Sequence, residues 1–169
     1  GEKNQSEDAF RLNVWTPDVR GKKPVLFWIH GGGFLTGGGA LSWYDARHLA
    51  ENGDVVVVTV NYRLGVFGNL RLPGISDGNL ALNDLITALK WVKRHISAFG
   101  GDPEQVTVAG QSAGAWYSLA LLASDESYQL FNRLGLMSFP GSVEALSEEN
   151  AQLLASLLLS HFNLSSKQA

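Results

Sequence analysis

The sequence predicts one α/β domain over residues 1–169, with a mostly parallel central sheet and helices on both of its faces. Three observations lead to this fold class. Short runs rich in β-branched residues alternate with longer segments of helical periodicity. The strongest run, "DVVVVTVNYR" at 54–63, is typical of a strand that is covered on both sides. No internal repeat, low-complexity tract or linker divides the chain.

Five segments are predicted to be strands. "LNVWTP" comes first, and "PVLFWIHG" follows as a buried strand that ends in glycines. "QVTVAG" and "RLGLMS" come after the β-branched run and supply the last two strands. In chain order, the predicted strands are 12–17, 24–31, 54–63, 105–110 and 133–138.

Helices are predicted between and after these strands. From Asn79 to Ala98, apolar side chains recur every three or four residues, which gives a helix one apolar face. The "FGGDP" turn, which contains Pro103, should close this unit before the next strand. The run "LLASLLLS" at 153–160 is too short to span a bilayer and is interpreted as part of a buried helix. The predicted helices are 42–52, 79–98, one starting at or just after Ser112, and one over about 147–160.

Composition excludes several classes of protein. The chain has 13 basic and 16 acidic residues, a net charge of −3 and no basic stripe, so we expect no nucleic-acid partner. No apolar run approaches the roughly 20 residues that span a bilayer, so we expect no membrane span. Because cysteine is absent, disulfides and thiolate metal sites are excluded, and a cytoplasmic location is favoured.

The segment Gly110-Gln111-Ser112-Ala113-Gly114 lies between the strand "VTVA" and the helical stretch "AWYSLALLA". A serine between two glycines at such a turn is typical of a nucleophile elbow. Side chains at 110 and 114 would collide across the turn, and the serine is held at a strained backbone angle with its hydroxyl clear of the sheet. The N–H of Ala113, at the helix N-terminus, can donate to a developing oxyanion. The alternative is a glycine-rich turn with a serine that only caps the helix.

A glycine loop, "HGGGF" (His30 to Phe34), follows the second predicted strand. Three consecutive glycines stabilise neither a strand nor a helix, because each loses much conformational entropy on ordering. They suit a loop whose backbone N–H groups approach a ligand, and such a loop upstream of G-x-S-x-G is the expected source of the other oxyanion donors. A flexible loop is the alternative, and it is our interpretation of "TGGGA" at 36–40.

Several stretches resemble type-B carboxylesterases, the carboxylesterase and cholinesterase family of α/β-hydrolases. "VNYRLGVFG" and "AFGGDPEQVTVAGQSAGA" carry this resemblance most specifically, and "KPVLFWIHGGGF" and "LFNRLGLMSFPGS" add to it. The resemblance covers residues 7–142 well. It implies an α/β-hydrolase three-layer sandwich that hydrolyses a small-molecule carboxylic ester through a serine acyl-enzyme, with no metal and no organic cofactor.

The resemblance also implies a role for individual residues. Ser112 matches the nucleophile. Gly32 and Gly33 match two oxyanion donors, and Ala113 supplies the third N–H. Gln111 stands where the family usually carries glutamate, which makes it a candidate substrate-binding residue and makes cationic substrates of the choline type less favoured.

The predicted nucleophile lacks a base in the sequence around it. In this fold the acid and the histidine follow the serine along the chain, yet His161 is the one histidine after Ser112, and it ends a predicted helix. We interpret His30 as a brace for the glycine loop, and His48 and His95 as ordinary helix residues. We therefore expect the N-terminal part of a hydrolase domain that is inactive alone. A second chain or a missing C-terminal part would supply the acid, the histidine and the last strands.

Two other functions stay open at this point. A non-catalytic, cholinesterase-like binding module would need neither the serine nor the glycine loop, and the presence of both argues against it. A hydrolase of thioesters, amides or carbamates would use the same residues as an esterase.

Overall fold

The computed structural model of this chain describes residue 6 and residues 9–164. Five strands form one sheet in the order β1-β3-β2-β6-β7. β1 runs antiparallel to β3, and the other neighbouring pairs are parallel, so the mostly parallel sheet is confirmed. The strands of this sheet are β1 (Leu12–Trp15), β2 (Lys23–Ile29), β3 (Val56–Val60), β6 (Gly101–Gln111) and β7 (Arg133–Met137).

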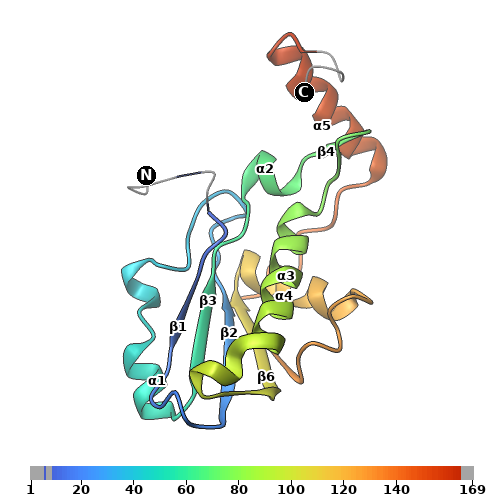
Figure 1. Cartoon of the computed structure of the whole chain (residues 1–169). Coiled ribbons are helices and arrows are strands. Elements are labelled where there is room, and N and C mark those ends of the chain that lie inside the picture. Colours follow the sequence, from blue (N-terminus) through green and yellow to red (C-terminus); the bar gives the residue numbers. More distant parts are fainter. Residues whose placement is uncertain (1–5, 7–8, 165–169) are drawn as a thin grey trace.

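Helices cover both faces of this sheet. They are α1 (Arg47–Gly53), α2 (Gly65–Asn69), α3 (Leu80–His95), α4 (Ala113–Ala123) and α5 (Glu148–His161). α1 packs on one face, and α3 and α4 pack on the other, so the layers are helix, sheet and helix (Figure 1). Between α2 and α3 the chain forms a short antiparallel hairpin of β4 (Arg71–Leu72) and β5 (Ser76–Asp77). The sequence analysis predicted neither this hairpin nor α2.

The main core lies between the sheet and the two helices α3 and α4. Val25, Phe27 and Ile29 alternate along β2, and each is at most 1% exposed. All five residues of β3 are buried, because both sides of this strand are covered. On the opposite face, a smaller cluster joins Ala50 of α1 to Val57 of β3.

Two predicted helices have different bounds in the structure. The segment 42–52 is not one helix, because a 3-10 turn over Ser42–Tyr44 ends before α1 begins at Arg47. Between them, the carboxylate of Asp45 accepts the N–H of Arg47 (3.1 Å). An aspartate that bonds to nearby backbone in this way competes with the helix pattern. The helix predicted over 79–98 ends at His95 and continues as a 3-10 turn over Ile96–Phe99.

β6 begins four residues before the predicted start, at Gly101 instead of 105. Pro103 therefore lies inside the strand and not in a turn that precedes it. The pairing between β2 and β6 shifts register near this point. Such irregular pairing is where a strand tolerates proline, which cannot donate a ladder hydrogen bond.

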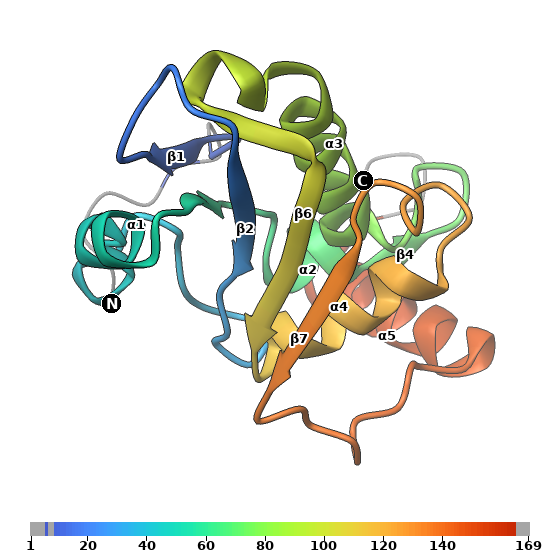
Figure 2. The same ribbon diagram turned by 90° about the horizontal axis from the view of Figure 1, so that it is seen from below.

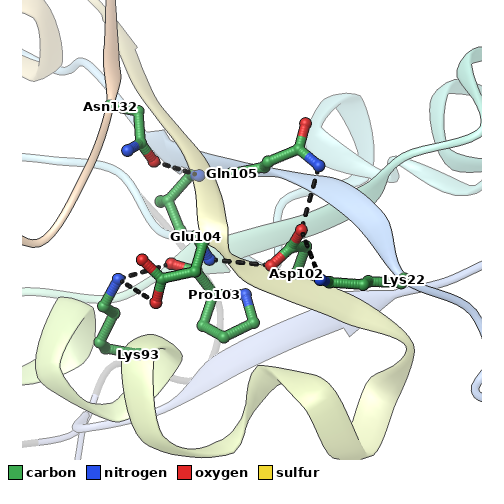
Figure 3. Close-up of polar contacts among 8 residues, drawn as sticks. Lys22, Lys93, Asp102, Pro103, Glu104, Gln105 and Asn132 are labelled. Atoms are coloured by element: carbon green, nitrogen blue, oxygen red, sulfur yellow. Dashed lines mark hydrogen bonds and ion pairs between the residues drawn. The ribbon is translucent and has the colours of Figure 1, made fainter.

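Polar side chains hold the start of β6 in place (Figure 3). Asp102 is 3% exposed and accepts hydrogen bonds from the N–H of Glu104 and the side-chain amide of Gln105, both at 3.0 Å. Lys22 approaches the same carboxylate at 3.6 Å. The bonds from Gln105 and Glu104 keep the pKa of Asp102 below its ordinary value. Asn132, just before β7, accepts a backbone N–H of β6 (3.0 Å), which aligns these two strands.

α5 forms where it was predicted, but it is not buried. Its first turn is capped by Ser147, whose side chain accepts the N–H of Asn150 (3.2 Å). Ala155 is buried, whereas Leu153, Leu154 and Leu157 are each about half exposed. The helix lies beside β4 and projects from the rest of the chain (Figure 1). The expectation of a buried helix over 153–160 was therefore wrong, because α5 packs through a narrow side only.

β7 lies at one edge of the sheet, beside β6 (Figure 2). Its side chains Leu136 and Met137 are 41% and 50% exposed. An edge strand offers backbone N–H and C=O groups that another strand can pair with.

Candidate active site

Ser112 lies in the turn between the carboxyl end of β6 and the first residue of α4. Its φ of 56° and ψ of −121° fall where residues other than glycine are rarely found. The N–H of Ser112 donates to the carbonyl of Met137 in β7 (2.9 Å), and its own carbonyl accepts the N–H of Trp116 (3.1 Å). The strained backbone angle predicted for this serine is present, and strain of this kind is found mostly at functional sites.

Glycine is required on both sides of Ser112. A Cβ at Gly110 would lie 2.4 Å from the backbone of Gly114, in agreement with the predicted collision across the turn. A Cβ at Gly114 would instead lie 2.1 Å from the carbonyl oxygen of Ile29, at the end of β2. The sequence analysis did not predict this second contact. Gly114 thus lets α4 approach the strand that leads into the glycine loop.

The glycine loop lies directly against Ser112. A Cβ at Gly31 would be 2.7 Å from the carbonyl oxygen of Gln111 and 3.2 Å from the Cβ of Ser112. Gly32 and Gly33 follow in exposed positions, with φ of 130° and 62°. The structure therefore brings Gly31, which directly precedes the two predicted oxyanion donors, against the predicted nucleophile, and the two segments come from the ends of two neighbouring parallel strands.

Ala113 and Gln111 flank Ser112 in the turn. Ala113 is the first residue of α4 and is 1% exposed. The first N–H groups of a helix have no partner within it, and they carry the positive end of the helix dipole. Gln111 ends β6, is half-buried, and places its side-chain oxygen against the backbone of Gly31.

His30 is the brace that the sequence predicted. Its ring is 1% exposed and stacks on Tyr62, with 4.5 Å between ring centroids. Nδ1 lies 2.8 Å from the carbonyl oxygen of Gly31, and a Cβ at Gly37 would lie 2.4 Å from the same nitrogen. Burial lowers the pKa of His30, so the neutral ring is favoured, and its Nδ1–H can donate to Gly31. One imidazole therefore contacts the chain before and after the exposed glycines.

The second glycine cluster is not a flexible loop. Gly37 packs on His30, and Gly39 donates its N–H to the side chain of Asn61 (2.8 Å). A Cβ at Gly39 would lie 2.9 Å from the backbone of Val60, at the end of β3. Because these glycines allow close packing, our interpretation of residues 36–40 as a flexible loop was wrong.

An aromatic cluster, which the sequence analysis did not assign to the site, adjoins the glycine loop. Phe34 makes edge contacts with Trp116 (5.8 Å between centroids) and Tyr117 (5.4 Å), and Tyr62 contacts Tyr117 at 5.2 Å. Burial raises the pKa of Tyr117 to about 12. Its hydroxyl donates to the side-chain oxygen of Asn69 (2.6 Å). Phe34 and Tyr62 follow parallel strands, and the other two rings stand on the first turns of α4. All four rings therefore lie near the carboxyl ends of the parallel strands, where ligand sites form in α/β sheets.

The other histidines occupy the positions predicted for them. His48 is exposed on α1, His95 ends α3 beside Trp91, and His161 ends α5, where its ring contacts Phe162. Within residue 6 and residues 9–164, no group of three or more His, Cys, Asp or Glu side chains could hold a metal ion. In the same part of the chain, no helix is both long and apolar enough to cross a membrane.

Known proteins are similar to this chain in sequence and in structure. The family model of the carboxylesterase family matches residues 1–167. A probable N-octanoylanthranilate hydrolase from Rhodococcus erythropolis is 48% identical over 155 residues, which are 90% of this chain and 34% of that protein. The para-nitrobenzyl esterase of Bacillus subtilis is 47% identical over 151 residues, 87% of this chain and 30% of that protein.

Solved structures agree with the sequence comparison. The carboxylesterase EST55 of Geobacillus stearothermophilus matches with a TM-score of 0.91 and 46% identity, over 95% of this chain and 36% of that one. The chain thus spans about a third of the length of the relatives that it matches. Its sheet is the α/β sheet of these hydrolases, as the sequence predicted. With a family model that matches nearly every residue, the chain belongs to the carboxylesterase family.

Proposed function

We propose that this chain carries the nucleophile and the oxyanion hole of a carboxylic ester hydrolase. One observation supports this most directly: Ser112 has a positive φ at a strand-to-helix turn, and the backbone of the glycine loop lies against it. A turn that only capped a helix would need neither the strain nor the loop. Membership of the family supports ester hydrolysis in general.

In this proposal, the Ser112 hydroxyl attacks the carbonyl carbon of the ester while a base removes its proton. The carbonyl oxygen becomes an oxyanion, which accepts hydrogen bonds from the N–H groups of Gly32, Gly33 and Ala113. The intermediate collapses, the alcohol leaves with the proton returned by the base, and the acyl group stays on Ser112. Water then attacks this acyl-enzyme by the same route and releases the carboxylic acid. No metal or organic cofactor takes part in these steps.

We propose that the base is a histidine outside these 169 residues. His30 is enclosed by Tyr62, Gly31 and Gly37, and its role is to hold the glycine loop. His161 stands on the exposed face of α5. The proposed partner is therefore the polypeptide that supplies a histidine and a carboxylate and that pairs with the free edge of β7.

The test is to compare three forms of the full-length protein: unchanged, Ser112→Ala and Ser124→Ala. Ser124 is a matched control because it follows α4 and lies outside the site. We expect Ser112→Ala to lose hydrolysis of p-nitrophenyl esters and labelling by a fluorophosphonate, with unchanged circular dichroism. Ser124→Ala should keep both activities.

Ester turnover by Ser112→Ala at a tenth or more of the original rate would overturn the assignment of the nucleophile. If the unchanged protein binds esters but neither hydrolyses them nor reacts with the fluorophosphonate, it is a binding module. Hydrolysis of thioesters or amides in preference to matched esters would instead identify the related class of hydrolase.

A further inference from the structure

Trp116 stands one helical turn after the proposed nucleophile. It is the fourth residue of α4, and its backbone N–H donates to the carbonyl of Ser112 (3.1 Å). The half-buried indole therefore stands at the start of the helix that follows Ser112, and its contacts show what lies around it.

On one side, the indole contacts the glycine loop. Its ring meets the ring of Phe34 edge-on, at 5.8 Å between centroids and 87° between planes. Phe34 has a φ of 65°, which a bulky side chain rarely adopts, and its carbonyl accepts the N–H of Gly65 (2.7 Å). The contact with Trp116 thus helps to hold the residue that directly follows Gly33.

On its other side, the indole binds the segment that follows β7, residues 138–146. Nε1–H of Trp116 donates to the carbonyl of Val143 (2.9 Å). This segment begins beside the nucleophile, because the carbonyl of Met137 accepts the N–H of Ser112. It leaves β7 and turns back toward α5 (Figure 2). The segment is therefore fixed to the turn of Ser112 at one end and to Trp116 farther along, with the apolar ring of Phe139 39% exposed between these two points.

We propose that Trp116 is a specificity-determining residue, whose indole forms the wall that limits the length of the acyl chain bound next to Ser112. This inference rests on the proposed function, since it presupposes an acyl group on that serine. The indole, Phe34 and Phe139 are apolar, so the wall suits a short aliphatic acyl chain.

The direction of the acyl chain follows from the chemistry at the tetrahedral carbon. Besides the Ser112 oxygen, this carbon carries the oxyanion, the leaving alcohol and the acyl chain. The oxyanion faces Gly32, Gly33 and Ala113, and the alcohol must face the base that protonates it. In this proposal the acyl chain takes the third direction, toward Trp116 and residues 138–146, which contact the glycine loop and the turn of Ser112.

The test measures kcat/KM of the full-length protein for p-nitrophenyl acetate, butyrate and octanoate. Trp116→Ala and Trp116→Leu remove the wall, while Trp116→Phe keeps a ring and loses the bond to Val143. A single methylene in an apolar pocket changes selectivity about 10- to 200-fold. We therefore expect the octanoate-to-acetate ratio to rise at least tenfold in the Ala and Leu variants and to change little in the Phe variant.

Trp91→Ala is the matched control, because this half-buried indole stands on α3 against Phe99. It should lower stability without changing the ratio. An octanoate-to-acetate ratio within twofold of the original in folded Trp116→Leu, or an equal change in Trp91→Ala, overturns the proposal for Trp116. The proposed function fails separately, through ester turnover by Ser112→Ala.

Discussion

Replacing Gly114 by alanine should separate α4 from β2 and thereby displace Ser112, the proposed nucleophile, from the glycine loop. The added Cβ would lie 2.1 Å from the carbonyl oxygen of Ile29 and 2.7 Å from that of His30. Ordinary contacts of a Cβ begin at 3.4 Å. The backbones must therefore part by 3.4 − 2.1, or about 1.3 Å, and neither neighbour is a flexible side chain that can move away.

This displacement is large on the scale of catalysis. Overpacking of a core contact costs about 1–3 kcal/mol of unfolding free energy. A misplacement of about 1 Å between reacting groups costs on the order of 10²-fold in rate. We expect Gly114→Ala in the full-length protein to lower kcat/KM for p-nitrophenyl butyrate about a hundredfold, and to lower the unfolding free energy within the range above.

The assay pairs steady-state kinetics with urea denaturation. The control is Gly53→Ala at the end of α1, where a Cβ would lie 3.5 Å from the nearest side-chain atom of Val55 and should cost little. If Gly114→Ala keeps the kcat/KM of the unchanged protein, the proximity of α4 and β2 does not set the geometry of the site. A loss of activity that matches the loss of folded protein would refute the argument in the same way.

Three further predictions concern neighbouring residues. Gly32→Ala would place a Cβ 2.0 Å from the carbonyl oxygen of Thr36, whereas Gly33→Ala meets no atom within 4 Å, so kcat should fall more in the first variant with little change in KM. Gln111→Glu should raise kcat/KM for butyrylcholine relative to a neutral butyrate ester, because it places a carboxylate beside Ser112; an unchanged ratio would contradict this. Burial lowers the pKa of His30 from 6.5, so the unfolded chain binds this proton first as the pH falls. Stability should therefore drop as the pH falls below about 6.5, until the folded His30 is protonated too, and urea titrations of His30→Gln should show a smaller drop over that window.

The sequence predicted elements that are long or strongly patterned. The β-branched run of β3 and the periodic apolar face of α3 depend on local pattern alone, and both form where expected. α2 was missed because it has five residues, two of them glycine, and is too short to show a periodicity. The exposure of α5 was missed for a different reason, since periodicity predicts a helix but not what covers it.

In the candidate site too, the sequence predicted the local features and missed the contacts between distant segments. The strain at Ser112 and the close approach at Gly110 follow from one turn, and both were predicted from five consecutive residues. The contact of Gly114 with Ile29 and the contacts of Trp116 join segments that are distant in the sequence, and no local pattern reports them. The serine and its glycines can thus be found in the sequence, whereas the walls around them need the fold.

The geometry of the site depends on the register of three adjacent parallel strands. β2 ends at the glycine loop, β6 ends at Ser112, and β7 ends at the carbonyl that accepts the N–H of Ser112. Asn132 holds the start of β7 against the middle of β6, where its side chain accepts the N–H of Val106. A slip of β7 by one residue would turn its side chains to the opposite face and take the carbonyl of Met137 away from Ser112. Because that carbonyl accepts the N–H of Ser112, we expect the conformation of the proposed nucleophile to depend on the pairing of β7 with β6, which Asn132 supports five residues before Met137.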